Sequence, residues 1–369
     1  MKQPNPQLLP SGLYDLLPPN AGLESHATAK LLASFESFGY AQVSPPLLEF
    51  EASLLSGRGK ALAPQTFRVM DPLSQTMMGF RPDITLQVAR IAGVRLSAEP
   101  RPLRLCYAGP ILQIKAEPLR TERQLTQAGI ELLGADSAEA DIEVMTVAAE
   151  ALQSLGVNDI SIDINLPGLL GELCPEARSD EKLAARIRDA VQRRDAAALH
   201  TLPLKNAQKL AQLMEAAGPV EKALAALKTC DEAQAQTLKT VIDSLREHCP
   251  QVAFTLDPLE YRGFDYHQGI GFSIFAKGLR HELGRGGRYR TERDNATGFT
   301  LYVTHLLPLL PVPDAKKRIL IPAGAPSSVT RRLREEGWVT VSAMTNDARK
   351  EAATLTCTHI FEQGKAKEL

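Results

Sequence analysis

The sequence predicts an α+β protein in which an antiparallel sheet is flanked by helices, with a helical insertion and a small C-terminal α/β domain. Apolar side chains alternate with polar or small ones over residues 160–164 and 269–276, the pattern of half-buried strands. Residues 175–248 are instead rich in Ala, Leu, Lys and Glu, which favour helices. After Pro308, Pro311 and Pro313, short apolar strands surround one more helix, which indicates a separate unit.

Composition places the chain among ordinary globular proteins. Its 369 residues include 42 Lys and Arg and 43 Asp and Glu, a net charge of −1. At about 100–200 residues per domain, this length predicts two or three domains. Hydrophobic residues make up 44% and charged residues 23%, which excludes an intrinsically disordered chain. The balanced charge argues against a dedicated nucleic-acid binder, since such proteins usually carry a basic excess.

The five cysteines stand far apart, without the close spacing of a zinc site or a redox motif. The first ten residues lack the apolar region of a secretory signal. Together these features predict reduced thiols and a cytoplasmic protein. The longest uncharged run, residues 295–313, is too polar and too rich in proline for a membrane span. We therefore expect no membrane association, and a buried strand leading into a helix at this run.

In the N-terminal half, Gly and Pro mark the ends of the expected elements. Gly39 stops the first helix, as a left-handed C-cap does. Pro45 and Pro46 remove two ladder donors, so their strand must lie at an edge or an interface. In order, we expect a helix over 23–38, an interrupted strand over 40–50, two strands around a turn at 71–72, a helix over 83–92, strands over 103–114 and 123–134, a helix over 139–155 and a strand over 160–164.

The remaining residues divide into an insertion, the end of the sheet and the C-terminal unit. We expect the helical insertion at about 172–249, after which strands return at 252–256 and 269–276. The sheet and its insertion would form one domain over residues 1–312. A second domain over 314–369 would contain strands at 318–321, 339–342 and 359–361 and a helix at about 327–336.

Polar residues recur on one face of the strand expected over 123–134. Because side chains alternate along a strand, Arg123, Gln127 and Glu131 share a face with Leu125 and Gly129. Buried polar groups must be paired. This face is therefore either solvated or part of a polar ligand pocket.

Two further segments combine polar groups with turns. At the junction before the 83–92 helix, Asp83 and Thr85 either cap the helix or face a ligand. Just before the 269–276 strand, Arg262 either holds a carboxylate in a bidentate pair or pairs with a neighbouring acidic side chain. A glycine-rich stretch at 284–289 allows close approach of the backbone to a ligand, although most such runs are turns.

Taken together, these segments contain the groups of an amino-acid pocket. Acceptors for an ammonium group are available at Asp83, Gln127 and Glu131, and a donor for a carboxylate at Arg262. Tyr266 and His267 can contact a ring. A charged hydrogen bond contributes on the order of 1.5–3 kcal/mol, so three or four of them set specificity.

The order and the amino-acid sequences of these segments resemble those in the catalytic domain of histidyl-tRNA synthetase, a class II aminoacyl-tRNA synthetase. The resemblance covers about residues 9–309. The matching segments are Gly39 to Glu49 for motif 1 with its proline at Pro46, Arg81-Pro82-Asp83-Ile84-Thr85 for the segment at the histidine amino group, Leu105 to Gly134 for motif 2, Arg262-Gly263-Phe264-Asp265-Tyr266 for the histidyl signature, and Gly286-Gly287-Arg288-Tyr289 for its partner.

The sequence departs from the synthetase pattern where ATP would bind. Gln113 stands where the motif 2 arginine holds the α-phosphate, and His305 stands where the motif 3 arginine holds the γ-phosphate. Thr304 replaces an acidic residue, and Tyr302 fills the place of a glycine that leaves room for adenine. Electrostatic stabilisation of the transferring group is usually the largest catalytic term. Adenylation should therefore be lost. A synthetase-like chain that keeps the amino-acid pocket and lacks the ATP-binding groups resembles the regulatory subunits of ATP phosphoribosyltransferase.

The resemblance implies a non-catalytic chain in the first step of histidine biosynthesis. The ammonium of histidine would meet Asp83, Thr85 and Gln127, and its carboxylate Arg262. Tyr266 completes the expected pocket, and the imidazole would meet Glu131 and His267, where the synthetase has Tyr. No catalytic residue, metal or cofactor is expected.

The expected partner is a short-form ATP phosphoribosyltransferase catalytic subunit, which this chain would activate and subject to feedback inhibition by histidine. The resemblance further implies a homodimer through the motif 1 region, within a hetero-octamer. Three alternatives stay open: a minimal or degenerate histidyl-tRNA synthetase, a tRNA-binding module, although tRNA binding is not expected, and a structural subunit that no longer binds histidine.

Overall fold

The computed structural model describes residues 8–115, 121–260, 267–312, 316–345 and 347–369. The chain forms two compact units, Met1–Pro311 and Val312–Leu369. Each unit has its own sheet and its own hydrophobic clusters. The first unit contains the segments in which polar side chains were expected to converge.

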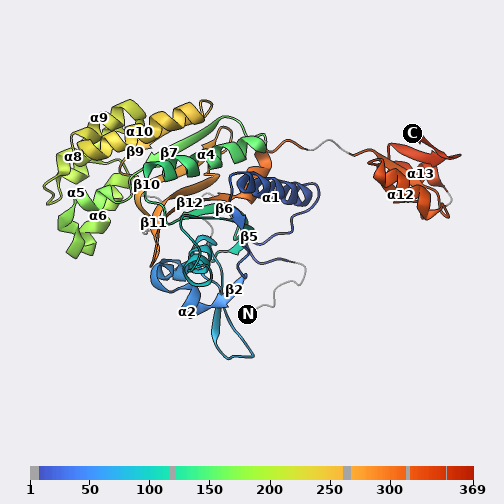
Figure 1. Cartoon of the computed structure of the whole chain (residues 1–369), viewed down its shortest axis with the longest axis horizontal. Helices are drawn as coiled ribbons and strands as arrows, with labels where there is room; N and C mark the ends of the chain where they lie inside the picture. The colour runs from blue at the N-terminus through green and yellow to red at the C-terminus, as the bar shows by residue number, and fades with distance from the viewer. Residues whose placement is uncertain (1–7, 116–120, 261–266, 313–315, 346) are drawn as a thin grey trace. The chain divides into compact units, whose positions relative to one another are not determined.

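The first unit is built on a nine-stranded sheet (Figure 1). Every neighbouring pair is antiparallel except β1 with β5 and β7 with β9. In spatial order the strands are β1 (Ala41–Gln42), β5 (Leu103–Leu112), β6 (Gln124–Leu133), β12 (Asn295–Tyr302), β11 (Gly284–Arg290), β10 (His267–Ala276), β7 (Ile160–Asn165), β9 (Ala253–Asp257) and β8 (Gly218–Pro219). The two-residue β1 lies at an edge, as the prolines that follow it require.

Helices α1 (Asn20–Ser37) and α4 (Ala138–Ser154) pack against each other and against the sheet (Figure 1). Gly39 follows α1 with φ of +84°, the left-handed conformation expected of the residue that ends this helix. Between β7 and β9 the helical insertion contains α5 (Leu169–Leu173), α6 (Glu181–Gln192), α7 (Ala196–His200), α8 (Ala207–Ala216), α9 (Val220–Lys228) and α10 (Glu232–His248).

Strand β6 separates two hydrophobic clusters, and its alternation decides which side chains reach the candidate site. Ala128, Ile130 and Leu132 belong to the large cluster formed with α1 and α4. Leu125 and Leu133 point the other way, into a smaller cluster with α3 (Thr85–Arg90). The buried polar residues of β6 therefore share the face of the smaller cluster, as the period of two predicts.

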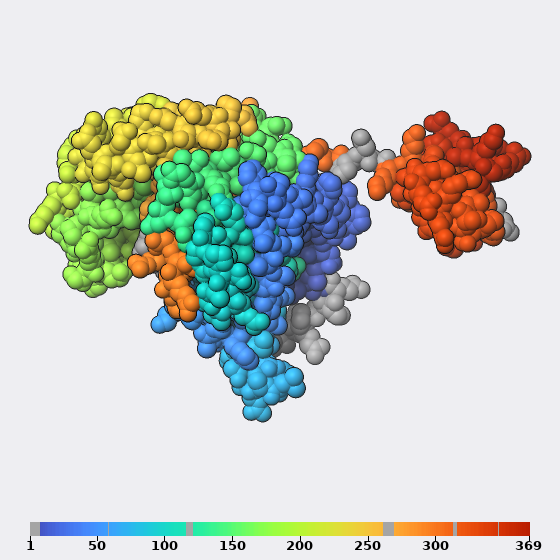
Figure 2. Space-filling model, in the orientation of Figure 1, coloured from blue at the N-terminus to red at the C-terminus, as the bar shows by residue number. Residues whose placement is uncertain are grey.

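A smaller sheet carries a projecting hairpin. Its strand order is β2 (Leu48–Phe50), β4 (Met77–Phe80) and β3 (Arg68–Met70), and all pairs are antiparallel. The turn between β3 and β4 projects from the body of the first unit, light blue in the space-filling view (Figure 2). Leu73 near its tip is 94% exposed. Short elements nearby are α2 (Glu51–Leu54), a 3₁₀ segment Gly57–Gln65 and a π-helical turn Ile91–Arg95 that continues α3.

The second unit is a four-stranded sheet with two helices. Strands β14 (Val339–Ser342), β13 (Arg318–Ile321) and β15 (His359–Glu362) are parallel, and β16 (Lys365–Glu368) closes the sheet in the antiparallel sense. Helices α12 (Ser327–Glu335) and α13 (Ala348–Thr354) connect them. The last part of the first unit, α11 (Val303–Leu306) and the 3₁₀ turn Leu307–Leu309, follows β12 directly, as expected of the uncharged run.

None of the helices within the described ranges is both long and apolar enough to cross a bilayer.

Candidate functional site

The site begins at the junction between β4 and α3, where Asp83 is 3% exposed. Its Oδ1 accepts a hydrogen bond from the backbone N–H of Thr85 over 2.9 Å. Its Oδ2 accepts from Nε2 of Gln127 on β6 over 3.0 Å. Burial raises the pKa of Asp83, while the hydrogen bonds from Gln127 and Thr85 oppose that shift. The aspartate therefore both supports the first turn of α3 and presents a buried carboxyl group.

Gln127 is completely buried and oriented by two hydrogen bonds. Besides its bond to Asp83, its Oε1 accepts from the backbone N–H of Ile84 over 3.1 Å. One amide thus satisfies the carboxylate and a backbone donor together. This arrangement fixes which end of the amide points at Asp83.

Glu131 lies on the same face of β6 and is 1% exposed. Its Oε2 accepts from the hydroxyl of Tyr289 on β11 over 2.7 Å, and its Oε1 accepts from the hydroxyl of Tyr107 on β5 over 3.4 Å. Burial raises the pKa of Glu131 to about 8, against the opposing effect of its hydrogen bonds. The carboxyl group is consequently able to hold or release a proton near neutral pH.

Hydroxyl groups connect the two carboxyl groups. Tyr107 lies 2.6 Å from Oγ1 of Thr300 on β12 and 3.1 Å from Oγ1 of Thr85. The two threonine hydroxyls are 3.4 Å apart. Gly298 lies directly opposite Glu131 in the ladder between β12 and β6, and a side chain there would collide with the glutamate. Glycine at this position thus leaves space for Glu131 to extend across the sheet.

These groups border a small cavity of about 20 Å³, enough for one water molecule. Its wall includes Asp83, Thr85 and Glu131 together with Arg285 of β11 and Tyr302 of β12. Arg285 forms an ion pair with Glu282 and lowers the pKa of Asp83 as a lesser contribution against the effect of burial.

The structure brings together four of the seven residues expected at the site, namely Asp83, Thr85, Gln127 and Glu131. His267 begins β10, and its backbone lies opposite Tyr289 in the ladder with β11. Arg262 and Tyr266 lie outside the described residues.

Sequence reasoning did not assign a role at the site to Tyr107, Tyr289, Thr300 or Arg285. Tyr289 belongs to the quoted Gly-Gly-Arg-Tyr segment, which was the available signal. Tyr107 and Thr300 had no such signal, because only the register of β5, β6 and β12 brings them to Glu131 and Thr85.

At two of the positions where ATP contacts were expected to be lost, the side chains form hydrogen bonds with other parts of the protein. Nε2 of Gln113 donates to the carbonyl of Pro82 over 3.2 Å. Oγ1 of Thr304 accepts from the backbone N–H of Thr126 and donates to Glu24 over 2.9 Å, which ties α11 to β6 and α1.

His305, which stands where the synthetase has the motif 3 arginine, belongs to a cluster of aromatic rings. His305 is 5% exposed, and its ring packs against Tyr302 and His281 at centroid distances of 5.1 and 5.2 Å. Among the described residues, no three or more His, Cys, Asp or Glu side chains gather as they would around a metal ion.

Comparison with known proteins places this geometry in a family. A profile of the histidyl-tRNA synthetase family matches residues 12–306. The chain is 45% identical to an ATP phosphoribosyltransferase regulatory subunit of Rhodospirillum centenum, over 99% of this chain and 97% of that protein. It is 41% identical to the protein of that name in Gluconobacter oxydans, over 99% and 98% of the two chains.

Solved structures support the fold. A protein of Bacillus halodurans described as an ATP phosphoribosyltransferase regulatory subunit/histidyl-tRNA synthetase superposes with a TM-score of 0.82 at 22% identity, covering 96% of this chain and 97% of that one. Histidyl-tRNA synthetase from Nostoc superposes with a TM-score of 0.76 at 18% identity, covering 96% and 90%. The predicted class II synthetase-like α+β fold is thus confirmed, and the chain belongs to the family of ATP phosphoribosyltransferase regulatory subunits.

Proposed function

We propose that this chain is the non-catalytic regulatory subunit of an ATP phosphoribosyltransferase complex and binds free histidine at the site around Asp83 and Glu131. It activates a short-form catalytic subunit and transmits feedback inhibition by histidine. Its own aminoacylation activity is lost. It acts in the cytoplasm and does not bind tRNA at physiological ionic strength.

The observation that carries this proposal is a contrast between the two halves of a synthetase site. The buried polar groups suited to an amino acid are present and hydrogen-bonded, with Gln127 holding Asp83 at 3.0 Å. The positions expected to hold cations for ATP carry Gln113 and His305, and their side chains contact other parts of the protein. Without positive charge there, a transferring phosphate is not stabilised.

The orientation of histidine follows from charge. Its ammonium group meets the Asp83 carboxylate, Thr85 and the Gln127 amide oxygen, and its imidazole meets Glu131 and His267. Its carboxylate meets Arg262, and Tyr266 completes the pocket. Histidine is larger than this cavity of about 20 Å³, so we expect side chains around it to move when histidine binds.

Regulation requires that histidine bind two states of the complex unequally. The inhibited state must bind histidine more tightly, because a ligand shifts an equilibrium only by its difference in affinity. Glu131 and Asp83 are buried beside strands β5, β11 and β12, so a change in their hydrogen bonds is transmitted to the packing of the sheet.

We further propose a homodimer through the motif 1 region, residues 39–49, within a hetero-octamer. Leu47 within this region and Phe50 just after it are 37% and 49% exposed, and Met70 on the neighbouring hairpin is 53% exposed. Exposed apolar side chains on and beside this small sheet support a surface that another protein covers.

The test combines this chain with the short transferase. Transferase activity is measured with and without this chain and across a histidine titration. We expect activation by the chain and inhibition by histidine, and Gln127→Leu should abolish the inhibition but keep the activation. Gln124→Leu, on the same strand but exposed, is the matched control. Absence of activation would overturn the proposed role.

A second assay separates the synthetase alternatives. ATP–pyrophosphate exchange with histidine reports adenylation directly, and we expect none above background. Exchange at a synthetase-like rate would revive the minimal synthetase. Binding of tRNA that weakens with salt would favour a tRNA-binding module instead. Histidine titrated into the chain should release or absorb heat, and absence of any signal would leave a purely structural subunit.

A further inference from the structure

A second and larger cavity, about 500 Å³, shares Tyr289 as a lining residue with the candidate histidine site. Its lining consists of Glu49 of β2 and three segments: residues 53–59 after β2, residues 86–94 of α3 and its π-helical continuation, and residues 289–293 at the turn between β11 and β12. We call it the arginine groove. Tyr289 is the one residue that borders both cavities among their described linings.

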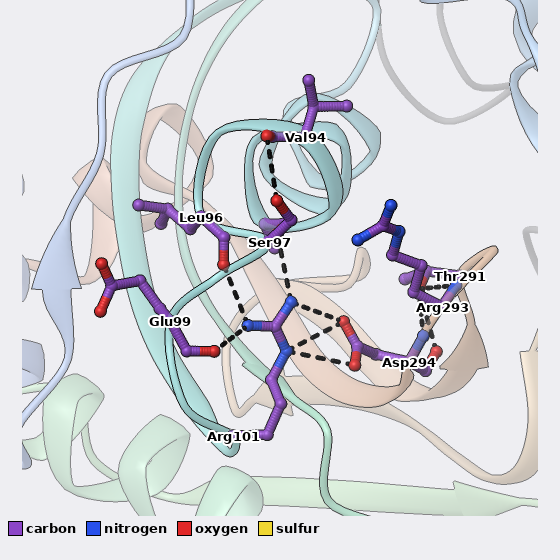
Figure 3. Close-up of polar contacts among 9 residues, drawn as sticks. Val94, Leu96, Ser97, Glu99, Arg101, Thr291, Arg293 and Asp294 are labelled. Atoms are coloured by element: carbon purple, nitrogen blue, oxygen red, sulfur yellow. Dashed lines mark hydrogen bonds and ion pairs between the residues drawn. The ribbon is translucent and has the colours of Figure 1, made fainter.

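Two arginines at the groove have no acidic partner among the residues that the structure describes. Arg290 and Arg293 are exposed, and neither side chain forms an ion pair or hydrogen bond with another residue in the described part of the chain. Figure 3 shows the Arg293 guanidinium extending beside the helical turn that carries Val94, with no dashed line drawn to it. Surface arginines are usually solvated in this way, so exposure alone does not indicate a binding site.

The other ionisable groups of the groove offset only part of these charges. Arg90 and Glu49 are paired with each other, with Nε of Arg90 donating to Oε2 of Glu49 over 3.1 Å. Glu292 is the remaining acidic side chain of the lining, and it is exposed. The groove therefore carries a net positive charge, with Arg290 and Arg293 on either side of Glu292 in the chain.

The turn that carries the two arginines is held in one conformation. Oγ1 of Thr291 accepts from the backbone N–H groups of Arg293 and Asp294, over 3.2 and 2.8 Å. The Asp294 carboxylate pairs with Arg101, whose Nη1 also donates to the carbonyl of Leu96 (Figure 3). Nη2 of Arg101 donates to the carbonyl of Ala92 as well. Arg101 thus fixes the arginine-bearing turn to the end of the opposite wall. Preorganisation of this kind lowers the entropy lost on binding.

Part of the remaining lining is apolar or lacks side-chain bulk. Leu54, Leu86 and Ala89 contribute apolar surface. Gly93 has no atom of another residue within 4 Å of where a Cβ would stand, so its backbone is open to the groove. Such a floor accommodates the uncharged body of a small organic molecule, while the arginines hold its charged group.

We propose that the arginine groove binds a phosphorylated small molecule, with the phosphate at Arg290 and Arg293 and the organic body against Leu86 and Ala89. Guanidinium groups bind phosphate oxygens through paired N–H donors, which gives both charge and geometry. A concave cavity of this size favours a small ligand over an extended segment of protein.

The test uses the full-length chain and three probes: inorganic phosphate, ribose 5-phosphate and ribose. Isothermal titration should detect phosphate and ribose 5-phosphate, the latter more tightly, and no binding of ribose. In the Arg290→Gln/Arg293→Gln double variant the affinity for ribose 5-phosphate should fall about tenfold or more. Arg280→Gln is the matched control, an exposed arginine beyond the opposite end of β11.

Each outcome decides the proposal. Binding lost in the double variant and kept in Arg280→Gln supports it. The proposal is overturned if neither phosphate nor ribose 5-phosphate binds, or if the double variant binds ribose 5-phosphate as tightly as the wild-type protein. It is also overturned if ribose binds as tightly as ribose 5-phosphate. Light scattering of the same variants adds a further criterion: a change of oligomeric state in the double variant, without loss of phosphate binding, would assign the groove to contact with a second copy.

Discussion

Gln127 lies on β6 and Asp83 at the junction between β4 and α3, yet the amide of one fixes the carboxyl group of the other at 3.0 Å. The same amide accepts from the backbone N–H of Ile84. Because both side chains are buried, each depends on the other for its hydrogen bonds. The pair links the structure of the site to its proposed role in binding the ammonium group of histidine.

Gln127→Leu should destabilise the protein by about 1–3 kcal/mol, because Asp83 and the Ile84 amide are then buried without this partner. Urea unfolding followed by circular dichroism measures the loss. Gln124→Leu, on the exposed end of β6, should change stability little. Equal stability of the two variants would contradict the role assigned to the Gln127 amide.

Glu131 should make stability fall as pH rises. Burial raises its pKa from about 4.5 to about 8, so the folded state keeps a proton that the unfolded state loses between these values. The contribution is complete below pH 4.5 and is lost through pH 8. Chemical unfolding at intervals from pH 5 to 8.5 should show a steeper decline in the free energy of unfolding for the wild-type protein than for Glu131→Gln. Glu247→Gln, at an exposed glutamate of α10, should keep the wild-type slope.

The fold was largely predictable where periodicity is strong. Strands β5 and β6, helix α4 and the apolar face of α10 follow alternations that run for several residues. The missed elements are short and exposed. Strand β16 consists of four exposed residues with two lysines, and α13 is seven residues long and begins at the Asp347 cap. Pairing with β15 and packing on the C-terminal sheet define them, and neither leaves a pattern in the sequence.

The candidate site was predictable along one strand but not across strands. The period of two placed Gln127 and Glu131 on one face of β6, and the structure confirms that both are buried there. Alternation along a strand says nothing about which residues of neighbouring strands lie opposite. The contacts of Glu131 with Tyr107 and Tyr289 therefore depend on tertiary structure.

Arg101→Gln should loosen the turn between β11 and β12 and cost about 2–3 kcal/mol. The arginine donates to the Asp294 carboxylate and to three backbone carbonyls, and the pair is mostly buried. Asp294→Asn should cost less, since it leaves the carbonyl contacts in place. Urea unfolding of both single variants and the double variant gives the coupling energy. Arg95→Gln, at an exposed neighbour, is the control.

His305→Arg tests whether the lost cation can simply be restored. His305 is 5% exposed and packs between Tyr302 and His281, so a longer, charged side chain has to displace these rings. Overpacking and burial of the charge should lower stability by about 1–3 kcal/mol.

ATP–pyrophosphate exchange with histidine should stay at background in His305→Arg, because Gln113 still supplies no charge at the other phosphate position. His200→Arg, at an exposed position of α7, controls for the added charge and should unfold like the wild-type protein. A variant with unchanged stability and measurable exchange would mean that the synthetase site persists and that replacing one arginine had silenced it.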